Sequence, residues 1–268
     1  MSYSADLALA LSLADAVDAV TVAGSLGEFT VEFKADDTPV TAVDRAAEEL
    51  IRNRLTVERP ADTIVGEEFG VTSGTEKLNA PRRWVIDPID GTKNFVRGVP
   101  VWATLIGLIV DDVAVVGVVS APALGRRWYA AQGSGAWTVT TVPGYPTEPR
   151  RISVSGTASL ADAFVSISSL IGWENRGLLD RVVELTRTTA RTRAFGDFWS
   201  YVLVAEGAVD IACEPELALH DMTALVSIVT EAGGSFTSLG GTPGPFGGDA
   251  LATNGILHDE VLALLAPR

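Results

Sequence analysis

The chain has 268 residues, 47% of them hydrophobic and 20% charged, so it can bury a substantial core as one large domain or two small ones. Its formal net charge of -14 argues against nucleic acid as a partner, because phosphate backbones attract Lys and Arg. A single cysteine, Cys213, excludes an intrachain disulfide and a cysteine cluster for zinc, and it fits a reducing cytoplasm.

Helical and strand patterns alternate along the first half of the chain. Apolar residues at three- and four-residue steps predict helices over 6–22 and 44–55. Strands are expected over 29–33, 62–66, 84–86, 103–109, 113–121 and 126–131. Pro88 lacks a backbone donor and is expected to end the strand over 84–86. Asp6 stands where a secretory signal would carry Lys or Arg, and Asp111 interrupts the longest apolar run, so we expect neither a leader nor a membrane span.

The second half alternates strands with helices. A segment rich in Pro, Gly and Thr over 141–149 separates the halves. Beyond it, strands are expected over 163–168, 192–195, 209–214, 235–237 and 250–253, and helices over 178–188, 198–206, 223–232 and from 259. This alternation predicts layered α/β packing. We therefore expect an α+β half over 1–145 and an α/β half over 146–268.

Two aspartates flank a Pro-Ile pair at the end of the strand predicted over 84–86. Asp87 and Asp90 can point toward one spot, while Gly91 and Thr92 offer backbone N–H groups to an anion. Two carboxylates this close repel each other unless a cation lies between them. Oxygen ligands favour Mg²⁺ or Mn²⁺ over zinc. The chain has only two histidines, which excludes a three-histidine zinc site and leaves carboxylate chemistry.

Taken alone, an Asp-x-x-Asp turn is more often an ordinary solvated loop. Its surroundings favour a functional site, because five acidic residues fall at the ends of predicted strands or helices, where functional groups are usually displayed. They are Asp44, Glu67, Asp87, Asp90 and Asp221.

Several sequence blocks resemble the inositol monophosphatase-like family of Mg²⁺-dependent, lithium-sensitive phosphatases. They are VGEE at 65–68, WVIDPIDGTKNF at 84–95, HDMTA at 220–224 and EAGG at 231–234. Their order and spacing extend the resemblance along the whole chain. It implies a layered αβαβα sandwich of the inositol monophosphatase and fructose-bisphosphatase type, and it implies hydrolysis of a phosphomonoester.

The resemblance also implies a set of metal ligands that would hold two or three Mg²⁺ ions. These ligands are Glu67, Asp87, the carbonyl group of Ile89, Asp90 and Asp221. Mn²⁺ shares the same ligand types, so the ligand set does not rank the two metals.

The same resemblance implies catalytic roles for several residues. Asp44 and Thr92 would orient the attacking water, and Glu67 would support a third, weaker ion. The N–H groups of Gly91 and Thr92 would hold phosphate oxygens. Lys34 and Asp37 correspond to a loop near the metals. His220 stands where the family usually has Trp, and we interpret it as a packing substitution that could hydrogen-bond Asp221.

The substrate depends on a second group of residues. Arg193, the run GDFWSY at 196–201, Glu214 and Trp102 resemble the histidinol-phosphatase branch of the family, which serves histidine biosynthesis. Asp197 and Glu214 would pair with the ammonium and imidazole groups of histidinol phosphate, while Trp102 would pack on the ring. Alternatively, Asp197 is a helix cap, and Trp102, Phe195 and Trp199 are aromatics of the core or of a dimer interface.

Other functions remain open on sequence grounds. Inositol-1-monophosphatase activity is the nearest alternative, fructose-1,6-bisphosphatase activity is more distant, and a regulatory binding protein is a third. As partners we expect a small phosphomonoester and a second copy of the chain in a homodimer, with no nucleic acid and no membrane.

Overall fold

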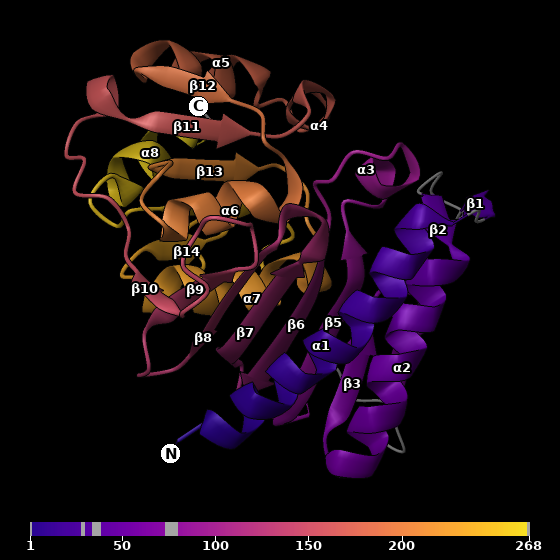
Figure 1. Cartoon of the computed structure of the whole chain (residues 1–268). Coiled ribbons are helices and arrows are strands. Elements are labelled where there is room, and N and C mark those ends of the chain that lie inside the picture. Colours follow the sequence, from indigo (N-terminus) through magenta and orange to yellow (C-terminus); the bar gives the residue numbers. More distant parts are fainter. Residues whose placement is uncertain (1, 28–29, 34–38, 73–79, 267–268) are drawn as a thin grey trace.

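The computed structural model describes residues 2–27, 30–33, 39–72 and 80–266, and these residues form five layers (Figure 1). Lys34 and Asp37 lie outside the described residues. Two helices cover one face of an eight-stranded sheet. Two central helices separate that sheet from a five-stranded sheet, and further helices cover the far face of the second sheet. The αβαβα sandwich expected from the sequence is confirmed.

The eight-stranded sheet has the order β10-β9-β8-β7-β6-β5-β3-β4. Neighbouring strands are antiparallel except for β3 and β5, which are parallel. Its strands are β3 (Thr63–Gly66), β4 (Gly70–Thr72), β5 (Arg82–Asp90), β6 (Ala103–Val110), β7 (Val113–Ala121), β8 (Arg126–Ala131), β9 (Ala136–Thr140) and β10 (Arg150–Ile152). A separate two-stranded sheet joins β1 (Val31–Phe33) to β2 (Pro39–Thr41).

The outer helices α1 (Ser4–Leu26) and α2 (Ala42–Glu58) cover one face of this sheet. By length and composition α1 could cross a membrane, with a mean hydropathy of 1.6. One of its faces is buried against the sheet, however, as expected for a core helix of a folded domain. Arg127 of β8 also pairs with Asp15 and Asp18 of α1 at 2.6 and 2.7 Å. These contacts attach α1 to the sheet.

The central helices α6 (Asp197–Ala205) and α7 (Leu219–Glu231) lie between the two sheets. Helix α7 approaches the first sheet closely at Gly107 and Gly117, which face each other across β6 and β7. A Cβ atom on Gly117 would lie 2.2 Å from the Ala224 carbonyl oxygen, and one on Gly107 would lie 2.5 Å from the Thr223 methyl group. The two glycines therefore let α7 bring its first turn to the end of β5.

The five-stranded sheet has the order β12-β11-β13-β15-β14. Strands β12, β11 and β13 are parallel, whereas β15 is antiparallel to both of its neighbours. Its strands are β11 (Phe164–Ile167), β12 (Arg191–Arg193), β13 (Ile211–Glu214), β14 (Ser235–Thr237) and β15 (Ala250–Thr253). Its outer face packs against α4 (Leu170–Asn175), α5 (Leu179–Thr188) and α8 (His258–Leu265).

The division at 145/146 stays a prediction. Strand β10 pairs with β9 in the first sheet, and the second sheet begins at β11. The central helices pack against both sheets, so the two sheets share one continuous apolar core.

Three details of the predicted elements were wrong. Strand β5 does not end at Pro88 but continues to Asp90, because its pairing with β6 shifts between Asp87 and Asp90, where Pro88 needs no ladder bond. Helix α7 begins at Leu219, four residues before the predicted start, so Asp221 lies in its first turn. Six short helices and strands were missed: β2, β4, β9, β10, α4 and α3 (Thr92–Val96).

Candidate active site

Acidic side chains from three separate elements meet at one end of the first sheet. Asp87 and Asp90 come from β5, Glu67 follows β3, and Asp221 lies in α7. These residues and His220 form two groups of three. Within each group, each residue offers one potential ligand atom, and these three atoms lie within 4.8 Å of one another. The groups are Glu67, Asp87 and His220, and Asp87, Asp90 and Asp221. Four of the sequence-predicted metal ligands therefore lie close together.

The irregular end of β5 aims its two aspartates. Asp87 accepts a hydrogen bond from the Ile89 N–H at 3.0 Å, and the Thr104 hydroxyl donates to the Pro88 carbonyl at 2.8 Å. The extra residue in β5 between the pairs formed by Asp87 and Asp90 turns the strand. Asp90 in turn accepts a hydrogen bond from the Phe198 N–H at 2.6 Å, which joins β5 to the start of α6.

Asp44 and Thr92 lie together, as the resemblance implies. Thr41 caps α2, and its N–H donates to Asp44 Oδ2 at 2.8 Å. Thr92 Oγ1 lies 3.4 Å from Asp44 Oδ1 and 3.0 Å from the Ile89 carbonyl oxygen, so the hydroxyl can donate to either. Burial raises the pKa of Asp44, and the nearby Glu67 raises it further.

A buried glutamate that sequence reasoning missed supports the turn that carries Glu67. Glu48 of α2 is 0% exposed and accepts hydrogen bonds from the Glu68 N–H at 2.7 Å and the Phe69 N–H at 3.2 Å. Arg52 donates to Glu48 at 2.6 Å. A Cβ atom on Gly66 would lie only 1.9 Å from Glu48 Oε1, so this position requires glycine. The spacing Glu-x-x-x-Arg on the buried face of a helix is the signal that could have revealed this pair.

Asp221 is held at the start of α7. The Ala218 N–H donates to its Oδ2 at 2.6 Å, and His220 Nε2 lies 3.5 Å from its Oδ1. His220 also lines the cavity described below. The histidine therefore lies beside Asp221, as the sequence interpretation expected, and it also belongs to one of the two groups of potential metal ligands.

The electrostatics of this cluster fit a hard cation. Burial raises the pKa of Asp87 and of Asp90 well above the ordinary range, and neighbouring carboxylates raise both further. Burial also raises the pKa of Asp221, although His220 opposes the shift. A divalent cation would favour the ionised forms and offset the repulsion between them. Four clustered carboxylates provide the oxygen ligands that such an ion needs.

A cavity of about 690 Å³ opens above the cluster. Glu67, Asp90 and Asp221 line it together with Gly91 and Thr92. The backbone of Gly91 has φ +86°, a conformation that favours glycine, and a Cβ atom there would lie 2.9 Å from the Val101 carbonyl oxygen.

Three further carboxylates, Asp197, Glu214 and Glu216, line the same cavity. Asp197 has φ +49°, and its carboxylate accepts a hydrogen bond from the Asn94 amide at 2.9 Å. Burial and the charge of Asp221 raise the pKa of Asp197 to about 6, although Lys93 opposes the shift. Burial, Asp197 and Asp221 raise the pKa of Glu214 to about 8. Asn94 and Lys93 were not assigned from the sequence, although both belong to the block at 84–95.

Two of the predicted substrate residues lie away from the cavity. Trp102 is 2% exposed and packs edge-on against Phe95, with ring centroids 5.1 Å apart. This placement matches the alternative in which Trp102 is a core aromatic. Arg193 is exposed at the end of the edge strand β12 and donates to the Thr192 carbonyl. Neither side chain is among the residues that line the cavity.

Comparison with known proteins agrees with this geometry. The model of the inositol monophosphatase family matches residues 4–266. A histidinol-phosphatase of Streptomyces coelicolor is 55% identical, with 99% of this chain and 98% of that protein covered. A histidinol-phosphatase of Mycobacterium tuberculosis is also 55% identical, with 97% of each protein covered.

Solved structures agree as well. The extragenic suppressor protein suhB of Bartonella henselae has a TM-score of 0.85 at 27% identity, with 98% of each chain covered. A Thermotoga maritima IMPase has a TM-score of 0.82 at 30% identity, with 97% of this chain and 96% of that chain covered. The fold, the acidic cluster and these matches together show that the chain belongs to the inositol monophosphatase family.

Proposed function

We propose that this protein is a Mg²⁺-dependent histidinol-phosphatase, which hydrolyses histidinol phosphate to histidinol and phosphate. The two relatives at 55% identity carry that name, and they match nearly the full length of this chain. The substrate would present its phosphate to the metal held by the acidic cluster and its cationic groups to Asp197 and Glu214, which line the same cavity.

One observation carries the choice of substrate: the cavity holds more buried carboxyl groups than a metal site needs, and a cationic ligand would favour their ionised forms. Asp197 and Glu214 lie beside the cluster, and each raises the pKa of a neighbouring carboxyl group. The Oε1 atom of Glu214 is buried and has no hydrogen-bond partner among the described residues. The ammonium and imidazolium groups of histidinol phosphate would supply the missing positive charge and hydrogen-bond donors. An inositol phosphate has neutral hydroxyl groups and would leave this charge uncompensated.

Glu67, Asp87, Asp90, Asp221 and the Ile89 carbonyl would hold the metal. When bound, Mg²⁺ would neutralise charge on the phosphoryl oxygens and acidify the attacking water. The chain's own groups would do the remaining work. Asp44 Oδ1 and Thr92 Oγ1 would orient the water, and the raised pKa of Asp44 suits a carboxylate that accepts a proton. The Gly91 and Thr92 N–H groups would hold phosphate oxygens.

Steady-state kinetics on the Mg²⁺-loaded full chain test the substrate directly. We expect kcat/KM to be highest for histidinol phosphate when it is compared with inositol 1-phosphate and fructose 1,6-bisphosphate. Asp197→Asn and Glu214→Gln should each raise KM for histidinol phosphate more than for inositol 1-phosphate. An equal or higher kcat/KM for inositol 1-phosphate would contradict the proposal. Absence of turnover on all three substrates would favour a regulatory binding protein.

We also propose that the protein is a cytoplasmic homodimer. Its cysteine is free and buried, which suits a reducing compartment.

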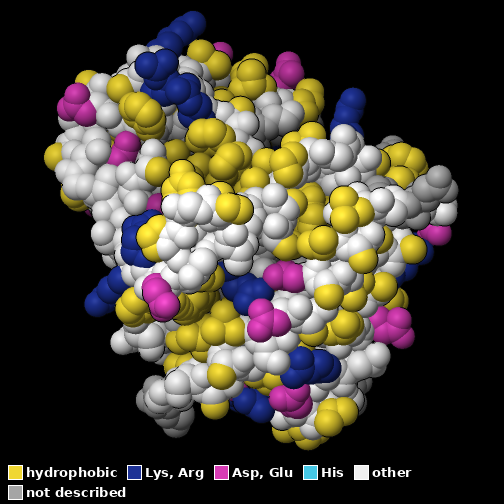
Figure 2. Space-filling view, viewed as in Figure 1, with side chains coloured by type: hydrophobic (Ala, Val, Ile, Leu, Met, Phe, Trp, Pro, Cys, Tyr) yellow, Lys and Arg dark blue, Asp and Glu magenta, His cyan; other side chains and the backbone are white. Residues whose placement is uncertain are grey.

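Hydrophobic side chains gather on the face between α4 and α6 in Figure 2. Leu170 and Ile171 of α4 are 49% and 59% exposed, and exposed apolar side chains that gather on one face are typical of interaction surfaces. Light scattering would give the mass of a dimer for the wild type, and Ile171→Glu should shift that mass toward the monomer.

A further inference from the structure

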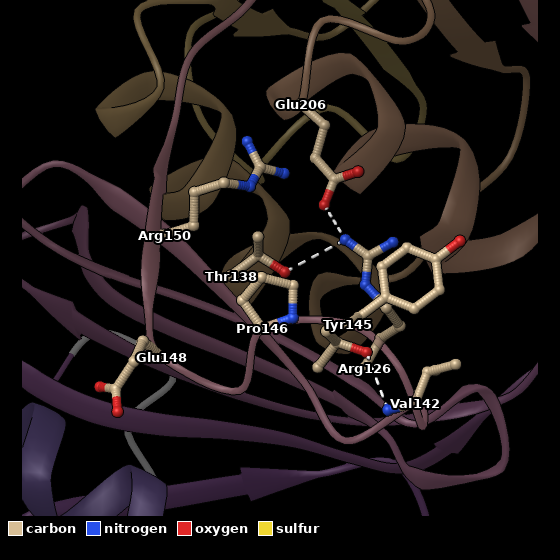
Figure 3. A pocket seen from close by; sticks show the side chains of 9 residues that line it. Arg126, Thr138, Val142, Tyr145, Pro146, Glu148, Arg150 and Glu206 are labelled. Carbon is tan, nitrogen blue, oxygen red and sulfur yellow. Dashed lines mark hydrogen bonds and ion pairs between the residues drawn. The ribbon is translucent and has the colours of Figure 1, made fainter.

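A second cavity lies on another part of the molecule. It has a volume of about 480 Å³ and lies between β8, β9, the segment 142–150 and the end of α6 (Figure 3). It shares none of its lining residues with the active-site cavity. Its size is within the range of small-molecule sites. The catalytic arrangement described above makes no use of it.

Arg126 forms a fixed cationic wall of this cavity. Its guanidinium lies over the Trp128 ring, 4.8 Å from the centroid, and it donates to Glu206 and to Thr138 Oγ1. Glu206 also accepts a hydrogen bond from Trp128 Nε1 at 2.7 Å, so this carboxylate is already paired. The Arg126 Nε is buried without a hydrogen-bond partner among the described residues. The contacts with Trp128, Glu206 and Thr138 therefore hold the guanidinium in a fixed position in the cavity wall.

Arg150 contributes a second positive charge. Its guanidinium has no ion pair or hydrogen bond among the described residues, although acidic residues outnumber basic ones by 34 to 20 in this chain. Figure 3 shows the guanidinium turned toward the side of Arg126 and Glu206, and Glu148 turned the other way. Glu206 is already paired with Arg126, and Glu148 is turned away, so Arg150 is the cationic group of this cavity that has no carboxylate partner among the described residues.

The remaining wall is apolar and includes an aromatic ring. Val142, Tyr145 and Pro146 line the cavity, and the Tyr145 N–H donates to the Val142 carbonyl at 3.2 Å, which folds this segment into a turn. A flat ring could pack against the Tyr145 phenol and bury apolar surface there. One unpaired guanidinium matches a single negative charge, whereas a phosphate dianion would need a second free cation, and Arg126 is already paired with Glu206.

We propose that this cavity is a second ligand site, which binds a small aromatic carboxylate between Arg150 and Tyr145. The carboxylate pairs with the Arg150 guanidinium, and the ring packs against Tyr145 and Pro146. The site is separate from the acidic cluster, so its occupation depends neither on the bound metal nor on the substrate.

Calorimetric titration of the Mg²⁺-loaded full chain tests the proposal with 2-naphthoate as the probe. We expect saturable binding of 2-naphthoate and at least about tenfold weaker binding of the neutral 2-naphthamide and of inorganic phosphate. Arg150→Gln should weaken 2-naphthoate binding by about tenfold and leave turnover unchanged.

The chain offers a matched control. Arg151 is the next residue of β10, and its guanidinium lies beside Gly135 and does not line the cavity. Arg151→Gln makes the same change in charge and should leave binding unchanged. Equal weakening by both substitutions, or no binding of 2-naphthoate by the wild type, would overturn the proposal. Loss of binding in Asp90→Asn would also overturn it, because the probe would then occupy the active-site cavity.

Discussion

Glu48→Gln tests whether the buried Glu48–Arg52 pair supports the turn that carries Glu67. The substitution keeps the shape of the side chain but removes its charge. The new amide can accept only through one oxygen, and its NH₂ group would face the donors of Arg52, Glu68 or Phe69.

The expected cost follows from burial. Breaking a buried ion pair by removing one partner typically costs about 3–5 kcal/mol. The side chain of Arg52 is 10% exposed and also donates to the Gly70 carbonyl, so it keeps some compensation. We therefore expect a loss near the lower end, about 3 kcal/mol in the free energy of unfolding. The turn that carries Glu67 would also lose its hydrogen bonds to Glu48, so the affinity for Mg²⁺ should fall by about tenfold.

Urea unfolding followed by tryptophan fluorescence measures the first effect, since Trp84 and Trp128 are fully buried and will report exposure of the core. Calorimetric titration with Mg²⁺ measures the second. Glu49→Gln is the matched control, because Glu49 is the exposed neighbour on the same helix. If the two variants unfold within about 0.5 kcal/mol of each other and bind Mg²⁺ equally, the supporting role assigned to Glu48 is wrong.

Three further predictions concern the metal ion, the packing of α7 against the first sheet, and the pH dependence of stability. Asp90→Asn should lower kcat by at least about a hundredfold, while the metal-free variant unfolds at the same or a higher urea concentration, because a repelled buried charge is removed. Exhaustive chelation should abolish wild-type turnover, and activity that survives it would exclude the metal model. Gly117→Val should cost about 2–3 kcal/mol, because it pushes α7 off the sheet, whereas Gly156→Ala, with open space around it, should be neutral. Burial lowers the pKa of His258 below 6.5 in the folded chain, so its contribution to stability is complete above pH 6.5 and is lost as the pH falls below that value.

The pH prediction has an internal control. His258 lies between the Thr237 and Thr253 hydroxyl groups, each 3.0 Å from a ring nitrogen. His258→Gln removes the titrating group. The unfolding free energy at pH 7.5 minus that at pH 5.5 should therefore be smaller in the variant than in the wild type. If this difference is larger in His258→Gln than in the wild type, the direction assigned to the pKa shift of His258 is wrong.

The sequence by itself determined the reaction type and most of the regular elements. Periodicity is a local property, so long amphipathic or apolar segments such as α2, β6 and β7 could be read directly from the residues. The acidic blocks have a characteristic order and spacing, which by themselves indicate the family and its carboxylate chemistry.

Only the tertiary structure decided which of those residues share a cavity. Side-chain burial depends on contacts between distant segments, so the sequence could not separate Asp197, which lines the cavity, from Trp102, which is enclosed in the core. The supporting role of Glu48 was overlooked because the turn it holds lies about twenty residues away, and no local pattern links that turn to α2. The close contact of α7 with Gly107 and Gly117 likewise depends on packing between layers. This packing brings Asp221 to the end of β5.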